Sequence, residues 1–536
     1  MGLTDLQQKI GQLMVFGFKG KTASPEIKKL IREHHVGGII LFGRNIGTPE
    51  EVLKLTTELQ QEAKNAGHTH PLLICIDQEN GVVRRLGEGS TVFPGAMLLG
   101  ATDHPENAYA IGVLTGRELK ALGINWNLAP VLDVNNNPNN PVIGVRSFGE
   151  SPEKVSLFGQ QAMKGMQDAG VITTLKHFPG HGDTHVDSHL DLPVISHSIE
   201  RLEKVELKPF VDCINQGADT VMTAHVYFPA IESEKNVPAT LSKKVITGLL
   251  REKLGFDGVV TTDCMEMNAI SETIGTARGG VEALKAGVDL IMVSHLHTRH
   301  FETLKEILTA IESGEITEET VDAAFNRVIR LKEKYLSWDE INLNHIEVSP
   351  EAGSINHELE ALEVYQQGVT VVKNEGSLLP LPLHEDHRVL VVYPENNIRM
   401  QVEDKKYLNL ALDEAIREIK PSVQILQLSN PPTLEEIQNA VLQAKNFDTV
   451  VVGTLSVQAG DPQVHLVEAL QNAGNQVVVI ATRSPYDLAY FSSIPAYICT
   501  YEFTYPALKT AAAAIFGQKH VKGKLPVTLP SHINNG

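Results

Sequence analysis

The segment KHFPGHGDTHVDSH, residues 176–189, holds the side chains best suited to proton transfer at neutral pH. It contains an Asp-x-His pair, Asp187 and His189. A carboxylate beside an imidazole can fix the tautomer of the ring and favour its charged form. His189 is therefore a candidate general acid and base, with Asp187 as the group that orients it. Because Asp and His also meet often on protein surfaces, the pair alone is weak evidence, and a purely structural loop is the alternative.

The same segment raises the question of a metal site. His181, His185 and His189 are four residues apart, and on a helix this spacing would align them as metal ligands. One proline and two glycines between residues 179 and 182 argue against a helix and favour a loop. We therefore predict no metal ion and no other cofactor, with a metal-dependent hydrolase as the alternative.

A second candidate group is Asp263, in the stretch VVTTDCMEMNAI. A carboxylate at the end of an apolar run can bind a metal, accept hydrogen bonds from sugar hydroxyls or act as a nucleophile. Glu266 follows three residues later and competes for these roles. We favour Asp263 because it directly ends the run.

Eight short apolar runs with helical segments between them position these groups. Apolar strands that alternate with helices are typical of a parallel sheet covered on both faces. Eight such units in about 300 residues predict a (β/α)8 TIM-type barrel, and an open doubly wound sheet is the alternative. The runs are residues 12–18, 37–43, 71–77, 124–130, 171–178, 219–226, 257–264 and 288–294.

Polar residues stand at or just after the ends of several runs. Asp77 ends the third run, Lys176 and His177 lie at the end of the fifth, and Arg85 and Arg146 follow the third and fourth. Barrel enzymes carry their chemistry at this edge of the sheet. Donors and acceptors that converge from several strands suit a ligand with many hydroxyl groups. For each arginine taken alone, the alternative to a ligand-binding role is an ion pair on the protein surface.

The last third of the chain predicts a second unit. A stretch rich in Pro, Asn, Gly and charges suggests a linker, and a helix and six further strand-like runs follow it. We expect the barrel at 1–340, the linker at 341–356 and a smaller α/β sandwich at 357–536. The six runs are residues 369–374, 388–394, 423–428, 448–454, 476–482 and 496–501.

Composition limits the possible partners and the compartment. The 536 residues include 46 Lys and Arg against 65 Asp and Glu, a formal charge of −19, which argues against a nucleic-acid or anionic-membrane binder. The sequence has neither a long apolar run nor a signal-peptide pattern, and its four cysteines are widely spaced. We expect a cytoplasmic protein whose partner is a small molecule rather than a nucleic acid or a membrane. The sequence does not indicate an oligomeric state.

Several motifs together resemble glycoside hydrolase family 3, and within it the β-N-acetylglucosaminidase branch. They are DQENG and RR within 77–85, APVLDV at 129–134, NPVIGVRSFG at 140–149, the segment 176–189 and TDCMEMNAI at 262–270. Two later segments resemble the C-terminal sandwich of the family, so the resemblance covers nearly the whole chain: VTVVKNEGSLLPL at 369–381 and GKLPVTLP at 523–530. One departure is visible, because the family usually reads DQEGGR where this chain has Asn80 and Val82.

The resemblance implies roles for the candidate residues. Asp263 would be the nucleophile, His189 the acid and base, and Asp187 its orienting partner. The residues that would hold a terminal N-acetylglucosamine are Asp77, Arg85, Arg146, Lys176 and His177. The implied reaction is retaining exo-hydrolysis of terminal β-linked N-acetylglucosamine from peptidoglycan-derived or chitin-type oligosaccharides. A phosphorylase that uses the same residues and a carbohydrate-binding protein with an inactive barrel are the alternatives.

Overall fold

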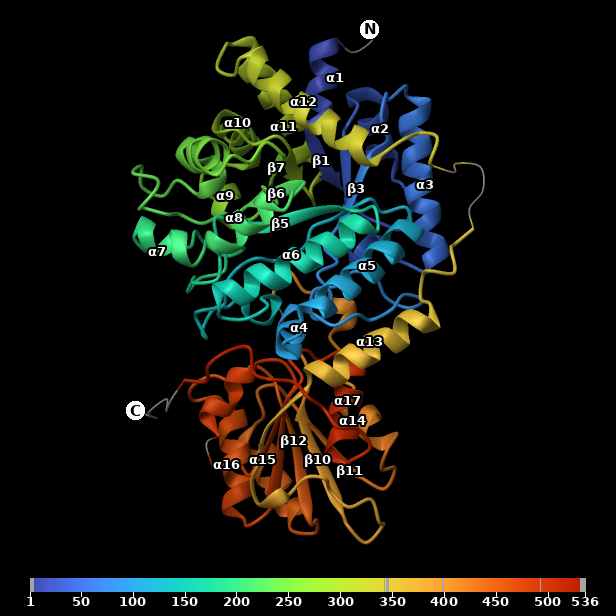
Figure 1. Cartoon of the computed structure of the whole chain (residues 1–536), viewed down its shortest axis with the longest axis vertical. Coiled ribbons are helices and arrows are strands. Elements are labelled where there is room, and N and C mark those ends of the chain that lie inside the picture. Colours follow the sequence, from blue (N-terminus) through green and yellow to red (C-terminus); the bar gives the residue numbers. More distant parts are fainter. Residues whose placement is uncertain (1–3, 342, 344–346, 398–399, 492, 531–536) are drawn as a thin grey trace.

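The computed structural model describes residues 4–341, 343, 347–397, 400–491 and 493–530 (Figure 1). Its first eight strands form one parallel sheet in the order β7-β6-β5-β4-β3-β2-β1-β8. A bridge between Thr261 and Leu290 links the two outer strands, so the sheet nearly closes into a barrel. The strands are β1 (Met14–Gly17), β2 (Gly38–Leu41), β3 (Leu73–Ile76), β4 (Trp126–Asn127), β5 (Ile172–Phe178), β6 (Thr220–Thr223), β7 (Val259–Thr262) and β8 (Ile291–Val293).

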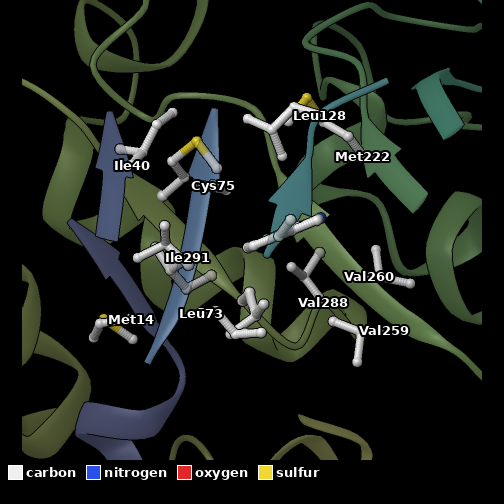
Figure 2. Packing of buried hydrophobic residues seen from close by; sticks show 14 of the residues in the cluster. Met14, Ile40, Leu73, Cys75, Leu128, Met222, Val259, Val260, Val288 and Ile291 are labelled. Carbon is white, nitrogen blue, oxygen red and sulfur yellow. The ribbon is translucent and has the colours of Figure 1, made fainter. Parts of the chain in front are cut away.

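Each of the eight predicted runs contains one of these strands, so the predicted barrel is confirmed and the open sheet is wrong. The strands are buried on both faces, which explains why they read as continuous apolar runs rather than alternating ones. Figure 2 shows side chains such as Ile40, Leu73, Cys75 and Leu128 in the packed apolar core. The inside of the barrel is therefore a solid core, and a ligand can enter only at one of its ends.

Helices cover the outside of the barrel (Figure 1). Local sequence signals set their starts. In α3, Thr48 and Glu51 form a capping box and Pro49 occupies the first turn. The helices of this part are α1 (Asp5–Gln12), α2 (Pro25–His34), α3 (Pro49–Asn65), α4 (Ala96–Thr102), α5 (Pro105–Ala121), α6 (Pro152–Asp168), α7 (Ile199–Lys204), α8 (Lys208–Asn215), α9 (Asn268–Ser271), α10 (Thr276–Ala286), α11 (His297–Glu312) and α12 (Glu318–Tyr335).

The remaining six strands form a second sheet in the order β11-β10-β12-β13-β14-β9. All pairs are parallel except β14 with β9, and the predicted α/β sandwich is confirmed. We call this part the C-terminal domain. Its strands are β9 (Thr370–Asn374), β10 (Val389–Pro394), β11 (Gln424–Leu428), β12 (Thr449–Thr454), β13 (Gln476–Ala481) and β14 (Ala496–Cys499), and its helices are α13 (Ile355–Gly368), α14 (Leu412–Arg417), α15 (Leu434–Ala444), α16 (Pro462–Asn472) and α17 (Tyr505–Ile515).

The two parts share a buried interface. One apolar cluster extends from the strands of the C-terminal domain to residues of α4 and α5, and α13 packs against both α4 and α17 (Figure 1). Hydrogen bonds cross the interface, since the Glu502 carboxylate accepts from Gly95 N at 2.7 Å and the Tyr365 hydroxyl donates to the Val92 carbonyl at 3.2 Å. These contacts fix how the C-terminal domain faces the barrel.

The boundaries predicted for the domains and the linker stay a prediction. Helix α12 ends at Tyr335 and α13 begins at Ile355, one residue before the predicted end of the linker at residue 356. Among the described residues, no helix is both long enough and apolar enough to cross a membrane.

A buried lysine supports the amino-terminal end of the barrel. Lys332 on α12 is fully buried, and its Nζ donates to Gln12 Oε1 at 2.8 Å and to the Gly37 carbonyl at 2.9 Å. Within the described part of the chain, no carboxylate forms an ion pair with it. Burial lowers the pKa of Lys332 to about 7.

This lysine should make the stability of the protein depend on pH. Its folded-state pKa lies below that of an unfolded lysine, about 10.4, so between these values the unfolded state binds more protons. The free energy of unfolding should therefore rise with pH from about 7 to 10, by up to about 1.4 kcal/mol per pH unit relative to Lys332→Met. Urea unfolding at pH 7, 8 and 9 measures this difference. Lys305→Met, at an exposed lysine on α11, is the control. An equal pH dependence in the wild type and Lys332→Met would contradict the prediction.

Candidate active site

A cavity of about 1010 Å³ opens at the carboxyl end of the barrel strands. Seven of the eight predicted site residues line it, and the eighth, Asp187, contacts one of the seven, His189. The structure thus brings the eight residues together at one end of the barrel, and their roles stay a prediction. The seven lining residues are Asp77, Arg85, Arg146, Lys176, His177, His189 and Asp263.

Asp263 follows β7 directly and lies within the electrostatic reach of three histidines. Its Oδ1 accepts a hydrogen bond from Cys264 N at 2.6 Å, which fixes the carboxylate. Burial disfavours the charged form, but the charges of His225, His177 and His189 and the hydrogen bond from Cys264 outweigh it. The pKa of Asp263 therefore lies below its usual range, and the carboxylate is ionised at neutral pH, as a nucleophile must be.

Glu266, the competitor of Asp263, has a different environment. Its two carboxylate oxygens accept three backbone hydrogen bonds, from Ser294 N at 2.8 Å, His295 N at 2.6 Å and Leu296 N at 2.9 Å. These contacts engage both oxygens and tie the turn after β8 to the turn after β7. Although Glu266 also lines the cavity, its geometry suits a structural role.

The Asp-x-His pair forms the predicted contact. His189 Nδ1 lies 2.7 Å from Asp187 Oδ1, and the same oxygen accepts from His189 N at 2.9 Å. Burial opposes ionisation of Asp187, but the hydrogen bond and charge of His189 outweigh it and hold the pKa of Asp187 below its usual range. An ionised Asp187 fixes the hydrogen on Nδ1 and leaves Nε2 of His189 for a substrate.

The segment that carries this pair is a loop, as predicted, and an internal scaffold holds it. His181 is buried, with Nδ1 2.9 Å from Thr184 Oγ1 and Nε2 3.0 Å from Ser188 Oγ. Burial lowers the pKa of His181 to about 4, so the ring is neutral at physiological pH. Gly182 is needed for space, because an added Cβ would lie 1.8 Å from the Val134 carbonyl oxygen.

Asp133 is a site residue that the sequence reasoning missed. This fully buried carboxylate lies 2.7 Å from His177 Nδ1 through Oδ2, and its Oδ1 accepts from His181 N at 2.7 Å. It therefore orients a cavity-lining ring and also fixes the start of the loop that carries His189. Two signals in the sequence could have found it: Asp133 lies three residues after the fourth predicted run, and it belongs to the motif APVLDV at 129–134.

A buried network of charges forms another wall of the cavity. Arg146 binds Glu79 in a bidentate manner at 2.8 and 2.9 Å. Lys176 Nζ lies 2.6 Å from Glu79 and 2.8 Å from Asp77, and Arg85 Nη2 lies 3.5 Å from Asp77. Both arginines are only 4% exposed, so the alternative of surface ion pairs is wrong for them. Glu79 belongs to the motif DQENG but is not among the predicted site residues.

In the part of the chain that the structure describes, two clusters of side chains have the residue types that could hold a metal ion. They are Cys264, Glu266 and His295, and Asp183, His197 and Glu206. In the first group, Arg44 Nη1 lies 3.2 Å from His295 Nδ1, so a guanidinium occupies the position that a cation would need. The predicted alternative, a set of His181, His185 and His189, is not among these groups.

Comparison with known proteins agrees with this architecture. Residues 5–331 match the model of the glycosyl hydrolase family 3 N-terminal domain, and residues 369–536 match that of the family 3 C-terminal domain. A beta-hexosaminidase A from Pseudoalteromonas piscicida is 33% identical over 95% of this chain and 92% of its own. A beta-hexosaminidase from Hydrogenovibrio crunogenus is 33% identical over 68% of this chain and all of its own.

A solved structure extends the comparison to the whole fold. It is a family 3 β-N-acetylglucosaminidase from Paenibacillus sp. str. FPU-7, with 42% identity, a TM-score of 0.91, and coverage of 99% of this chain and 100% of that one. The barrel and the C-terminal domain both find counterparts in one family. The chain therefore belongs to glycosyl hydrolase family 3.

Proposed function

We propose that the protein is a retaining exo-β-N-acetylglucosaminidase that removes terminal β-linked N-acetylglucosamine from oligosaccharides. The observation that carries the proposal is that an ionised carboxylate, Asp263, and an imidazole oriented by a second carboxylate, His189 with Asp187, face one cavity. The names of its relatives, beta-hexosaminidase and β-N-acetylglucosaminidase, support the same substrate class.

In the first step, protonated His189 donates the Nε2 proton to the glycosidic oxygen while Asp263 attacks the anomeric carbon. The glycosidic bond breaks, the aglycone leaves as an alcohol, and an ester joins the sugar to Asp263. Asp187 stabilises the imidazolium and keeps its ring aimed at the leaving oxygen.

In the second step, neutral His189 takes a proton from water, and the resulting hydroxide attacks the anomeric carbon. The ester bond breaks, Asp263 regains its charge, and the sugar leaves with the configuration it had in the substrate. We assign Asp77, Arg85, Arg146, Lys176 and His177 to the subsite of the terminal sugar, since their polar groups line the same cavity.

We propose substrates of peptidoglycan-derived or chitin-type chains in the cytoplasm. The four cysteines are all free and buried, which is consistent with a reducing compartment. The relatives named above are hydrolases, so the comparisons do not favour a phosphorylase. Incubation of substrate with and without phosphate, followed by an assay for N-acetylglucosamine 1-phosphate, tests this point directly.

Trapping with a slow 5-fluoro N-acetylglucosaminyl donor tests the proposed reaction. We expect mass spectrometry of the digested protein to find the sugar on Asp263, because an ester there is the intermediate of a retaining reaction. Proton NMR of the hydrolysis should show the β-anomer as the first product. A label on Glu266, or the α-anomer as first product, would overturn the assignment.

A further inference from the structure

A buried histidine packs against the turn that carries the proposed nucleophile. His225 follows β6, and Cys264 is the second residue after β7. Parallel pairing places Thr223 of β6 beside Thr262 of β7, so His225 and Cys264, each two residues further along, come level with each other. His225 is 1% exposed and is not among the residues that line the cavity. Its Nε2 lies 3.1 Å from the Cys264 carbonyl oxygen, so the ring contacts the turn from behind.

This contact fixes where the His225 ring carries its hydrogen. A carbonyl oxygen can only accept, so Nε2 holds the hydrogen and donates it to Cys264. On the other side of the ring, Nδ1 lies 2.8 Å from Thr240 Oγ1. Burial lowers the pKa of His225, so the ring is neutral at physiological pH and Nδ1 accepts from the Thr240 hydroxyl. Thr240 thus sets the tautomer that the contact with Cys264 needs.

The surroundings of Thr240 hold this arrangement in place. Thr240 Oγ1 lies 2.8 Å from the Thr223 hydroxyl and 3.0 Å from the Ala224 carbonyl, and both threonines are fully buried. One hydroxyl hydrogen serves one acceptor at a time, and Nδ1 of a neutral ring must accept to be satisfied. The backbone beside the ring is fixed as well, since Ala224 N donates to the Phe178 carbonyl at 2.7 Å. The Nε2–H of His225 therefore keeps one direction.

The turn that His225 contacts is the one that holds Asp263. Cys264 N donates to Asp263 Oδ1 at 2.6 Å. The carbonyl of the same residue accepts from His225 Nε2 and from Met267 N, each at 3.1 Å. Two hydrogen bonds on Cys264 therefore connect the imidazole to the carboxylate. Without the ring, the Cys264 carbonyl would keep only the bond within its own turn.

We infer that His225 is a positioning residue for the nucleophile: its Nε2–H anchors Cys264, whose N–H holds the Asp263 carboxylate for attack on the anomeric carbon. This inference rests on the proposed function. His225 lies outside the cavity lining and takes no part in proton transfer or sugar binding. It acts on the chemical step, because a displacement of about 1 Å in a reacting group can lower a rate by on the order of 10²-fold.

Full-length variants separate the hydrogen bond of His225 from its packing. His225→Leu fills the site with an apolar side chain and removes the donor, whereas His225→Gln supplies an amide N–H in place of Nε2. Thr240→Val removes the hydroxyl that sets the tautomer and leaves the ring in place. His68→Leu is the matched control. His68 is also buried, and its Nε2 lies 3.0 Å from the Ile31 carbonyl, but it belongs to the connection from α3 to β3 at the other end of the barrel.

For His225→Leu we expect kcat/KM to fall about 10- to 100-fold, the effect of a displaced nucleophile. The loss should be equal on a dinitrophenyl glycoside and on a disaccharide, because every leaving group needs attack by Asp263. The Kd of N-acetylglucosamine, from calorimetric titration, should stay within about twofold of the wild type. His225→Gln should recover kcat/KM to within about tenfold, as a restored neutral hydrogen bond does, and Thr240→Val should lose about tenfold. His68→Leu should keep kcat/KM and Kd.

Circular dichroism shows whether each variant is folded. A folded His225→Leu with wild-type kcat/KM would overturn the role of His225, as would a loss that His225→Gln does not reduce or a loss confined to the disaccharide. If His225→Leu does not fold, Thr240→Val decides the question, and wild-type kcat/KM in that variant would overturn the role. Failure of the proposed function has a different signature, since the wild type itself would release no N-acetylglucosamine from any substrate.

Discussion

Asp263→Ala should lower kcat/KM for an aryl N-acetylglucosaminide by on the order of 10⁴-fold or more, as loss of a group central to covalent catalysis does in other enzymes. The Asp263 carboxylate accepts a hydrogen bond from Cys264 N, lies within the electrostatic reach of three histidines and is ionised at neutral pH. Alanine removes the group that forms the ester with the sugar and leaves space beside the anomeric carbon.

Because alanine leaves this space, a small added nucleophile should be able to replace the missing carboxylate. Added azide should restore turnover of a substrate with a good leaving group, and the product should be the α-glycosyl azide, because azide attacks from the side that Asp263 vacates. NMR identifies the anomer. Glu266→Gln is the matched control, since it keeps an acceptor oxygen for the turn after β8 and should retain activity that is independent of azide. Azide rescue of Glu266→Gln instead of Asp263→Ala would exchange the two roles.

His189→Ala should reduce kcat/KM on a disaccharide by ~10²–10⁴-fold, the range typical of a positioned general acid and base. The loss on a dinitrophenyl glycoside should be far smaller in the first step, because that leaving group needs no proton. Presteady-state kinetics should then show a burst of dinitrophenol, since the second step still lacks its base. The ratio of the two substrates is therefore the decisive measurement.

Two neighbouring positions sharpen this test. Asp187→Asn keeps the hydrogen-bonding shape but removes the charge that stabilises the imidazolium, so its loss should be smaller than that of His189→Ala and equally dependent on the leaving group. His185→Ala alters an exposed histidine of the same loop and should leave both substrates near wild-type rates. A His189→Ala enzyme with full activity on the disaccharide would contradict the assignment.

Much of this fold was accessible from the sequence, because strands buried on both faces read as unbroken apolar runs. All fourteen predicted runs contain a strand of the structure. The carboxyl ends of parallel strands meet at one edge, so the convergence of Asp77, Lys176 and Asp263 followed from the order of runs alone. Asp187 and His189 were visible because their contact spans two residues and is set by the local chain.

Other features depend on contacts between residues far apart in the chain, which the local pattern does not encode. The sequence left Asp263 and Glu266 as competitors. Only the backbone N–H groups of the turn after β8 show that the oxygens of Glu266 are already engaged. In the same way, the role of Asp133 arises from its contacts with a ring and a loop more than forty residues later.

The sequence by itself determined the two-part architecture, the edge of the barrel that carries the chemistry and the residue types at that edge. Strand burial and short-range spacing are sufficient for these. The tertiary structure alone decided which carboxylates are engaged by backbone donors, which arginines are buried in ion pairs, and that residues 401–406 of the C-terminal domain line the cavity. The physical reason is that each of these features depends on the packing of one domain or loop against another. The hydrophobic periodicity of a strand or a helix, two or 3.6 residues, reflects only the local chain and does not encode such packing.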